Sequence, residues 1–274
     1  MKDLEGKTAA ITGAGSGLGR AMALAFAREG MQLALADIDD HALSETVSLL
    51  GSPPVASMRL DVSKESDMEE FSRRIEKPWL VCNNAGVSPL GAVWESSVGD
   101  WQWILNVNLW GVIHGVRAFT PRLIAQGEGH IVNTASVAGL ISPPGSGAYN
   151  VTKHAVVALS ESLHHDLRER NSAVGVSVLC PAYVPTGISD SERNRPAGLS
   201  SAPKSEATKA KEANLKKAVA SGRLTADAVA RAVVAAVKED RFYILTHPRI
   251  KGAIQARMED ILAQRAPRDP LRLG

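Results

Sequence analysis

The sequence predicts a single α/β domain built on a doubly wound parallel sheet of seven strands, with helices on both faces. The first observation is that short apolar runs alternate with helical patterns along the chain, joined by short connectors. The second is size, because 274 residues, 45% of them hydrophobic, suffice for one large domain of this class or for two small ones. The third is that glycine-rich or polar segments follow the ends of successive strands, where such sheets bind ligands. The uninterrupted alternation favours one domain.

Charge and composition exclude several classes of protein. A formal net charge of +2 is too small to indicate a nucleic-acid partner or a membrane-surface partner. No run of apolar residues is long enough to span a membrane, and the first apolar run is too short for a signal peptide. We therefore expect a soluble cytoplasmic protein. Cys82 and Cys180 lie in apolar runs and are expected to be buried and reduced, and no Cys/His spacing predicts a metal site.

The chain opens with a strand, a glycine-rich turn, a helix and a second strand. The strand covers residues 7–12, the turn 13–19, the helix 20–29 and the second strand 31–37, with Gly30 closing the helix. The strict dinucleotide pattern G-x-G-x-x-G is not met, since the spacing is Thr-Gly-x-x-x-Gly-x-Gly. The physical purpose is the same, because glycines let the backbone approach a pyrophosphate at a helix N-terminus. A plain glycine-rich hairpin is the alternative.

Asp37 ends the second strand, eighteen residues beyond Gly19. A carboxylate at this position accepts hydrogen bonds from both hydroxyls of an adenosine ribose and repels a 2′-phosphate. Ile38 is not basic and Ser16 brings no cation to the turn, so the residues favour NAD over NADP. The alternative is that Asp37 merely caps the next turn.

The middle of the chain continues the alternation. Asp61 follows the third strand, and the fourth strand runs directly into Asn83, Asn84, Ala85 and Gly86, a composition that suits close approach of a ligand. The predicted elements are a helix over 41–50, a strand over 55–60, a helix capped by Ser63 and reaching residue 76, a strand over 79–82, a helix over 98–125 that Pro121 bends or breaks near its end, and a strand over 130–136.

Tyr149 and Lys153 share one face of the next helix, one turn apart. A neighbouring ammonium favours the phenolate, so we expect Lys153 to lower the pKa of Tyr149 toward neutral pH and to make it an acid/base. Alone, Tyr-x-x-x-Lys is a weak signal. The strand end at Ser136, thirteen residues upstream, and the glycine-rich turn strengthen it.

The remaining chain supplies a further strand over 175–180 and then changes composition. Residues 187–222 are rich in Ser, Ala, Lys and Glu, and we interpret them as a mobile lid over the site, although a solvated helix or loop is the simpler alternative. The last predicted elements are a helix over 225–238 capped by Thr225, a strand over 241–246, a helix over 250–264 and a loose tail over 265–274. We expect residues 1–248 to form the catalytic domain and 249–274 a C-terminal helix and tail.

Taken together, these motifs resemble the short-chain dehydrogenase/reductase family, in its standard single-domain, Rossmann-like branch. The resemblance covers about residues 5–190, with a plausible last helix and strand to 248. It rests on the order and spacing of the following residues: Thr12, Gly13, Gly17, Gly19, Asp61, Asn83, Asn84, Ala85, Gly86, Asn108, Ser136, Tyr149, Lys153, Pro181 and Thr186.

The resemblance implies a role for each matching position. Tyr149 is the acid/base, Ser136 hydrogen-bonds the same substrate oxygen, and Lys153 lowers the Tyr149 pKa and holds the nicotinamide ribose. Asn108 keeps a water that links Lys153 to solvent as a proton relay. The implied cofactor-binding residues are Thr12, Gly13, Gly15, Ser16, Gly17, Leu18, Gly19, Asp37, Ile38, Asp61, Val62, Asn84, Ala85, Gly86, Tyr149, Lys153, Pro181, Val184 and Thr186.

One departure from the family pattern concerns the substrate wall. Pro-Gly usually follows the sixth strand, whereas Pro181 is followed by Ala182, whose methyl group narrows the space beside the nicotinamide. We expect the substrate to contact Ser136, Leu140, Tyr149 and Tyr183, in a pocket more apolar than charged.

The sequence therefore predicts an NAD-dependent oxidoreductase that interconverts a medium-sized apolar secondary alcohol and a ketone. The resemblance also implies a homotetramer or dimer that packs the Asn108 and Tyr149 helices against their symmetry mates, through an apolar face at Val156, Val157 and Leu159. The alternatives are an NAD-sensing regulatory protein on the same fold and a reductase of C=C or C=N bonds.

Overall fold

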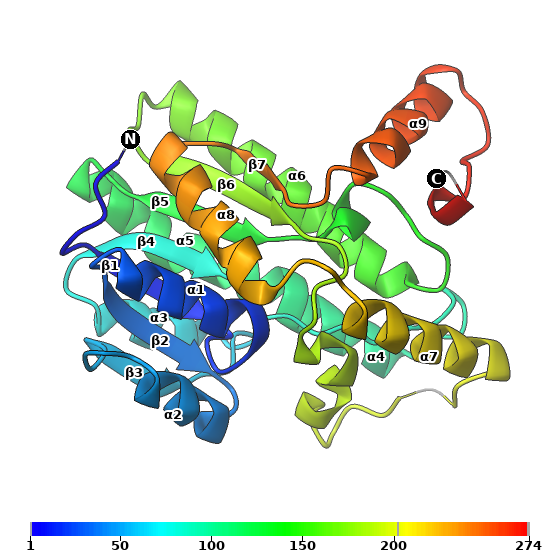
Figure 1. Ribbon diagram of the computed structural model, residues 1–274, viewed down its shortest axis with the longest axis horizontal. Helices are drawn as coiled ribbons and strands as arrows, with labels where there is room; N and C mark the ends of the chain where they lie inside the picture. The colour runs from blue at the N-terminus through cyan, green and yellow to red at the C-terminus, as the bar shows by residue number, and fades with distance from the viewer. Residues whose placement is uncertain (1, 202, 273–274) are drawn as a thin grey trace.

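The computed structural model describes residues 2–201 and 203–272. These residues form one seven-stranded sheet in the order β3-β2-β1-β4-β5-β6-β7, and every neighbouring pair of strands is parallel (Figure 1). The predicted single-domain, Rossmann-like doubly wound sheet is confirmed, and each predicted strand overlaps an observed one. The strands are β1 (Thr8–Thr12), β2 (Gln32–Asp37), β3 (Ala56–Arg59), β4 (Pro78–Asn83), β5 (His130–Thr134), β6 (Gly175–Cys180) and β7 (Tyr243–Leu245).

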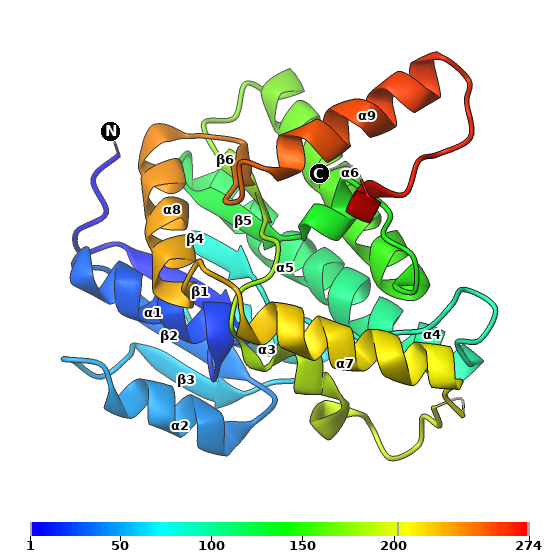
Figure 2. The ribbon, with the colours of Figure 1, turned by 45° about the vertical axis from the view of Figure 1, so that its right-hand side comes forward.

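Helices cover both faces of this sheet, as Figures 1 and 2 show. One core cluster joins α1, α2 and α8 to the sheet through side chains such as Phe26, Leu43 and Val233. A second cluster joins α3, α5 and α6 to the opposite face through side chains such as Phe71 and Phe119. The α-helices are α1 (Gly17–Arg28), α2 (Asp40–Ser48), α3 (Glu65–Arg73), α4 (Val98–Leu105), α5 (Gly111–Gln126), α6 (Gly147–Glu169), α7 (Glu206–Ala220), α8 (Ala226–Glu239) and α9 (Ile250–Leu262).

The sheet reverses its winding between β1 and β4. Chain order leads outward from β1 through β2 to β3, and then returns to β4 on the other side of β1. The central strands β1, β4, β5 and β6 are buried along their whole length, which is why they read as continuous apolar runs. The carboxyl ends of β1 and β4 therefore flank the crevice in which open α/β sheets bind ligands.

Local signals explain several helix boundaries. Gly30 and Gly127 follow α1 and α5 in left-handed conformations, with φ of +75° and +73°. Thr225 accepts a hydrogen bond from Ala228 N, as its predicted capping role requires. Ser63 does not cap α3, because its hydroxyl donates to Asp61 Oδ1 at 2.7 Å and Lys64 takes the cap position. The predicted capping role of Ser63 is therefore wrong, because its hydroxyl group bonds the carboxylate of Asp61 instead of a backbone N–H group of α3.

The helix predicted over residues 98–125 is present but interrupted. α4 and α5 are joined by η1 (Asn106–Trp110), a single π-helical turn in which Gly111 N donates to Asn106 O. Single π-helical turns of this kind are frequent at functional sites. Pro121 does not break the helix, which continues to Gln126.

The lid region and the tail both contain regular structure and side-chain contacts. The lid region contains η3 (Gly187–Asn194) and α7, and the serine hydroxyl of Ser191 accepts a hydrogen bond from Ser88 N at 3.0 Å. The tail contains η4 (Pro270–Arg272), and Arg268 donates to both carboxylate oxygens of Asp260 at 3.0 Å. The prediction of a loose tail is therefore wrong for residues 265–272, since a buried carboxylate holds it; the last two residues lie outside the described part.

Two residues expected on an oligomer face are core residues instead. Val156 and Val157 are 0% and 6% exposed and pack in a cluster with Val178 and Cys180 of β6. Among the described residues of η1, α5 and α6, the exposed large apolar side chains are Trp110, Ile124 and Val151. Within the described ranges, no helix has the length and hydropathy that a membrane crossing requires.

Candidate active site

A cavity of about 580 Å³ lies at the carboxyl ends of the strands. Its walls are formed by the segments that follow β1 through β6, together with η3, α7 and the start of α9. Among the predicted site residues, those that line it are Gly13, Ser16, Gly17, Leu18, Asp37, Ile38, Asp61, Val62, Asn84, Ala85, Gly86, Ser136, Tyr149, Lys153, Pro181, Tyr183, Val184 and Thr186. Segments far apart in the sequence thus meet at one edge of the sheet.

The glycine-rich turn forms one end of the cavity. Gly13 and Gly17 have φ of +65° and +52°, which L-residues rarely adopt. Ser16 occupies the N-cap position of α1 and makes no side-chain capping bond, and the first turn of α1 carries no acidic residue. The turn and the helix N-terminus thus present backbone N–H groups and a partial positive charge to the cavity, an environment that suits an anion.

Three predicted cofactor residues lie behind the cavity wall and hold it in shape. A Cβ atom on Gly19 would lie 1.9 Å from Gly13 O, so only glycine lets α1 pack this closely on the turn. Gly15 N donates to Asp37 Oδ2 at 2.7 Å. Thr12 Oγ1 accepts hydrogen bonds from the backbone N–H groups of Asn84 and of the next residue, at 3.0 and 3.3 Å. These residues are structural supports of the turn rather than part of its surface.

Two carboxylates follow β2 and β3. Asp37 accepts from Gly15 N through one oxygen and from Asp39 N, at 3.0 Å, through the other. Asp61 Oδ1 accepts from the backbone N–H and the hydroxyl of Ser63. Each carboxylate is therefore held in place by backbone donors while it lines the cavity.

Asn84 links the ends of three neighbouring strands. Its side-chain Nδ2 donates to Thr12 O at 3.1 Å, and its Oδ1 accepts from Thr134 Oγ1 at 3.2 Å. These bonds explain why an amide side chain stands directly after a buried strand.

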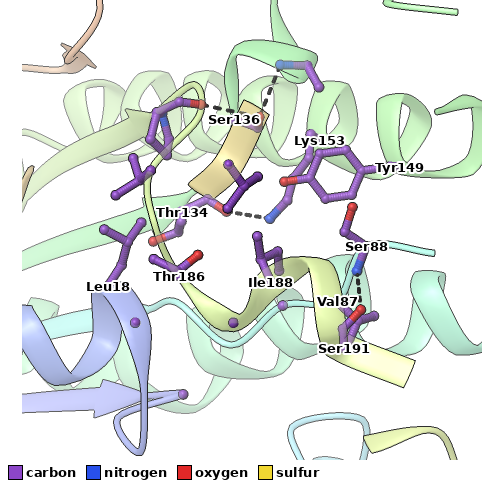
Figure 3. A pocket seen from close by; sticks show the side chains of 18 of the residues that line it. Leu18, Val87, Ser88, Thr134, Ser136, Tyr149, Lys153, Thr186, Ile188 and Ser191 are labelled. Carbon is purple, nitrogen blue, oxygen red and sulfur yellow. Dashed lines mark hydrogen bonds between the residues drawn. The ribbon is translucent and has the colours of Figure 1, made fainter. Parts of the chain in front are cut away.

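Ser136, Tyr149 and Lys153 converge on the other side of the cavity (Figure 3). Lys153 Nζ donates to Thr134 O at 2.8 Å and lies 5.7 Å from the centre of the Tyr149 ring. Ser136 lies beside the Tyr149 phenol, and its own hydroxyl donates to Pro181 O at 3.3 Å. Ser136 itself is buried, and its Oγ accepts from Ala138 N at 3.2 Å.

The pKa of Tyr149 does not follow the prediction. Burial raises the pKa of Tyr149 above its ordinary value of 10.0, and the nearby Ser136 hydroxyl offsets only part of that rise. The expected lowering by Lys153 is wrong for this structure, because loss of hydration penalises the phenolate more than its neighbours stabilise it. Tyr149 is therefore a neutral phenol at neutral pH.

The same desolvation acts on Lys153 in the opposite direction. Burial lowers the pKa of this ammonium group from 10.5 to about 8. Because a charged amine is costly in a buried site, Lys153 titrates far closer to neutral pH than an exposed lysine does.

This lowered pKa predicts how stability depends on pH. Between about pH 8 and 10.5 the unfolded chain binds the Lys153 proton and the folded chain does not, so stability rises with pH across that window. The unfolding free energy of the wild type, minus that of Lys153→Met, should increase by up to roughly 3 kcal/mol between pH 7 and 10.5. Urea titrations of both proteins check this, and a pH-independent difference would contradict it.

Asn108 lies inside the π-helical turn and is completely buried. Its Oδ1 accepts from Val87 N at 2.8 Å, and its Nδ2 donates to Val87 O at 2.9 Å. A Cβ atom on Gly86 would lie 3.4 Å from Asn108 Oδ1 and 3.7 Å from Lys153 Nζ. The amide of Asn108 and the ammonium of Lys153 therefore border the same small space beside Gly86.

The segment after β6 completes the side of the cavity that holds the glycine-rich turn. A Cβ atom on Gly17 would lie 3.1 Å from Thr186 Cβ, so this segment lies directly over the glycine-rich turn. Ala182 lines the cavity, and its backbone N–H donates to His247 Nδ1 at 3.2 Å, a support that the sequence did not indicate.

The substrate side differs from the prediction at one position. Leu140 is not among the described residues that line the cavity and packs against a core cluster, whereas its neighbour Ile141 lines the cavity. Tyr183 lines the cavity as predicted and is 42% exposed. The lining residues that the sequence did not single out include Trp103, Val107, Ile188, Lys211, Asn214, Leu215, Ala218, Ile250 and Leu271. Four of these residues belong to α7 and recur at three- and four-residue steps, which places them on one helix face. That spacing is the one sequence signal that could have identified them.

Comparisons with known proteins agree with this geometry. A family model described as short chain dehydrogenase matches residues 7–197. A CLA biosynthesis dehydrogenase/reductase of Lactiplantibacillus plantarum is 34% identical over 278 residues, covering 97% of each chain. A C alpha-dehydrogenase of Sphingobium sp. is 30% identical and covers 97% of this chain and 89% of its own.

A solved structure of a short-chain dehydrogenase/reductase from Burkholderia phymatum, in complex with NAD, superposes with a TM-score of 0.96. It is 50% identical, and the match covers 100% of both chains. Since the family model also spans more than half of the 274 residues, this chain belongs to the short-chain dehydrogenase/reductase family of oxidoreductases.

Proposed function

We propose that this protein is an NAD-dependent oxidoreductase that interconverts a secondary alcohol and a ketone. The observation that carries the proposal is one cavity whose lining joins a glycine-rich turn to Ser136 and Tyr149, with the buried Lys153 beside them. The first feature suits a dinucleotide and the second suits proton exchange at an oxygen atom.

We also propose that residues 1–248 form the catalytic domain, with 187–222 as a mobile lid, and that 249–274 are a C-terminal helix and tail.

The residues fit a nicotinamide dinucleotide along the whole cavity. The turn at Gly13–Gly17 would hold the pyrophosphate. Thr186, whose Cβ atom lies 3.1 Å from the position of a Cβ atom on Gly17, would hold the nicotinamide carboxamide. Asp37 would hold the adenosine ribose, and Asp61 with Val62 would meet the adenine. Lys153 would hold the nicotinamide ribose.

The charges around Asp37 support NAD over NADP. The acidic side chains that line the described cavity are Asp37, Asp39 and Asp61, and all of them follow β2 or β3. The cations that line it, Lys153, Arg193 and Lys211, belong to other segments. A 2′-phosphate would therefore meet carboxylates of the lining, while a nearby cation, Arg59, donates to Ile38 O at 3.1 Å and is not among the described lining residues.

Bound nicotinamide would supply or accept the hydride, and the protein would place the substrate and manage the proton. Tyr149, which burial keeps protonated, would donate its proton to the ketone oxygen, and Ser136 would hydrogen-bond the same oxygen as its charge develops. Asn108 and Lys153 border the space beside Gly86, which we propose holds the water of the proton relay.

The exposed apolar side chains of η1 and α6, Trp110 and Val151, are 48% and 49% exposed. We propose them as part of a homodimer or homotetramer interface, in place of the buried Val156 and Val157. A cytoplasmic location likewise stays a prediction.

A panel of secondary alcohols tests the proposed function. With NAD and a medium-sized apolar alcohol, absorbance at the nicotinamide band should rise, and NADP should support a markedly lower kcat/KM. Binding of NADH without turnover of any alcohol would favour an NAD-sensing protein. Turnover of alkenes or imines alone would favour a C=C or C=N reductase.

A further inference from the structure

The face of α7 that borders the cavity carries two polar residues, both exposed to solvent, followed by half-buried apolar ones. Lys211 and Asn214 line the cavity three residues apart, and Leu215 and Ala218 continue the same face. In Figures 1 and 2, α7 lies beyond the arrowheads of the strands, at the carboxyl end of the sheet. This helix therefore presents an ammonium group and an amide at one end of the cavity wall, and apolar surface next to them.

Lys211 lies against the chain that leads into the Tyr149 helix. A Cβ atom on Gly145 would lie 2.5 Å from Lys211 Cδ and 2.9 Å from Lys211 Nζ. Gly145 is four residues before Tyr149, so the two Cα atoms are at most about 14 Å apart. A molecule reacting at the Tyr149 phenol could therefore extend one end to the Lys211 ammonium without leaving the cavity.

The other lysines of the lid are mostly neutralised within the lid. Lys204 pairs with Glu212, Lys209 pairs with Glu206 at 2.7 Å, and Lys216 pairs with Asp190 at 2.7 Å. Among the described residues, Lys211 and Lys217 have no such carboxylate partner. Of these two, Lys211 lines the cavity and Lys217 does not.

The cavity-lining charges near Lys211 are positive. The acidic side chains that line the cavity are at the end proposed for adenosine, after β2 and β3. Besides Lys211, the cation of the lid that lines the described cavity is Arg193. Its guanidinium group donates to Gly187 O and Asp190 O at 3.0 and 2.9 Å, so backbone acceptors hold it in place. An anion beside Lys211 would therefore meet no cavity-lining carboxylate within the described part of the lid and would gain hydrogen bonds from Lys211 and Asn214.

We propose that the substrate carries a carboxylate group, which Lys211 and Asn214 bind while the alcohol or ketone carbon lies at Tyr149. This inference rests on the proposed function and adds an acid to the apolar substrate that it names. The stem of the substrate would lie against Leu215, Ile250 and Leu271, which line the same cavity. One ammonium and one amide suit a singly charged carboxylate better than a phosphate, which needs more positive charge.

Turnover of an acid and of its neutral analogue tests the proposal. The probes are hydroxyoctanoic acid, with the hydroxyl group next to the terminal methyl, and its primary amide. In the wild type, KM should be lower for the acid. In Lys211→Met, KM for the acid should rise about fivefold, and in Lys211→Glu about tenfold or more, with KM for the amide and kcat little changed. Lys211→Arg should retain the preference, and added salt should weaken it.

Lys217→Met is the matched control, because it removes an equally unpaired charge from the same helix outside the cavity. Equal KM values for acid and amide in the wild type, or the same loss in Lys217→Met, would overturn the inference.

Calorimetric titration of the NADH complex with octanoate and octanamide separates this inference from the proposed function. Lys211-dependent binding of octanoate without turnover of any alcohol would uphold the acid site and reject the dehydrogenase. Turnover of alcohols that does not change when Lys211 is replaced would uphold the dehydrogenase and reject the acid site.

Discussion

Replacing Tyr149 by Phe should lower kcat by about 10² or more while NADH binding stays intact. The substitution removes one hydroxyl group and keeps the half-buried ring. Ser136 would still hydrogen-bond the substrate oxygen, and Lys153 would keep its bond to Thr134 O. The hydride could still move, but no positioned group would exchange a proton with the oxygen. Steady-state turnover and fluorescence titration with NADH measure the two quantities separately.

Tyr243→Phe is the control for this prediction. It removes the same hydroxyl group from a tyrosine of β7 whose phenol donates to Glu161 and that is not among the described cavity-lining residues. Its turnover should equal that of the wild type. A Tyr149→Phe enzyme with normal turnover would refute the assignment of Tyr149 as the acid/base and leave another group to be found.

The sequence predicted best what depends on chain order. Alternation of strands and helices determines which segments follow strand ends, and parallel strands bring those ends to one edge. Asp37, Asn84 and Ser136 therefore line the cavity, as chain order alone indicated. The glycine spacing located the turn between β1 and α1 for a similar reason, because a turn between strand and helix is a local feature.

Features that depend on packing were predicted less well. Leu140 and Ile141 are neighbours in sequence, and only the direction of each side chain in the short helix η2 (Val137–Gly139) and the residues after it decides which one faces the cavity. The pKa of Tyr149 depends on how much water the fold excludes, whereas the sequence shows only that a lysine is nearby.

The ordered tail depends on a contact that composition does not reveal. Arg268 and Asp260 are eight residues apart, and their ion pair forms where the tail folds back on α9, with Asp260 buried. Composition alone, with two prolines and several charges, indicated a loose segment. The same pair brings the tail back toward the cavity, where Leu271 adds to the wall.

Gly19→Ala should reduce NADH affinity by about 10²-fold and lower the unfolding free energy by about 1–3 kcal/mol. The added methyl group would lie 1.9 Å from Gly13 O and 2.8 Å from Asn84 Nδ2. The first of these contacts is with backbone, so no rotamer change relieves it, and α1 has to move away from the turn. Such a movement separates the helix N-terminus from the proposed pyrophosphate site. NADH fluorescence titration and urea unfolding measure the two effects.

Gly252→Ala makes the same change in another helix and should have the opposite sign. Gly252 lies in α9, and a Cβ atom there meets nothing within 4 Å. Alanine in a helix interior is more stable than glycine by about 1 kcal/mol, so this variant should be slightly stabilised and should bind NADH normally. Gly19→Ala has the same favourable change in helix propensity. It should nevertheless be less stable than the wild type, because the clash with the turn costs more free energy than the propensity gains. If Gly19→Ala bound NADH as tightly as the wild type, close packing of α1 on the turn would not be what shapes the cofactor site.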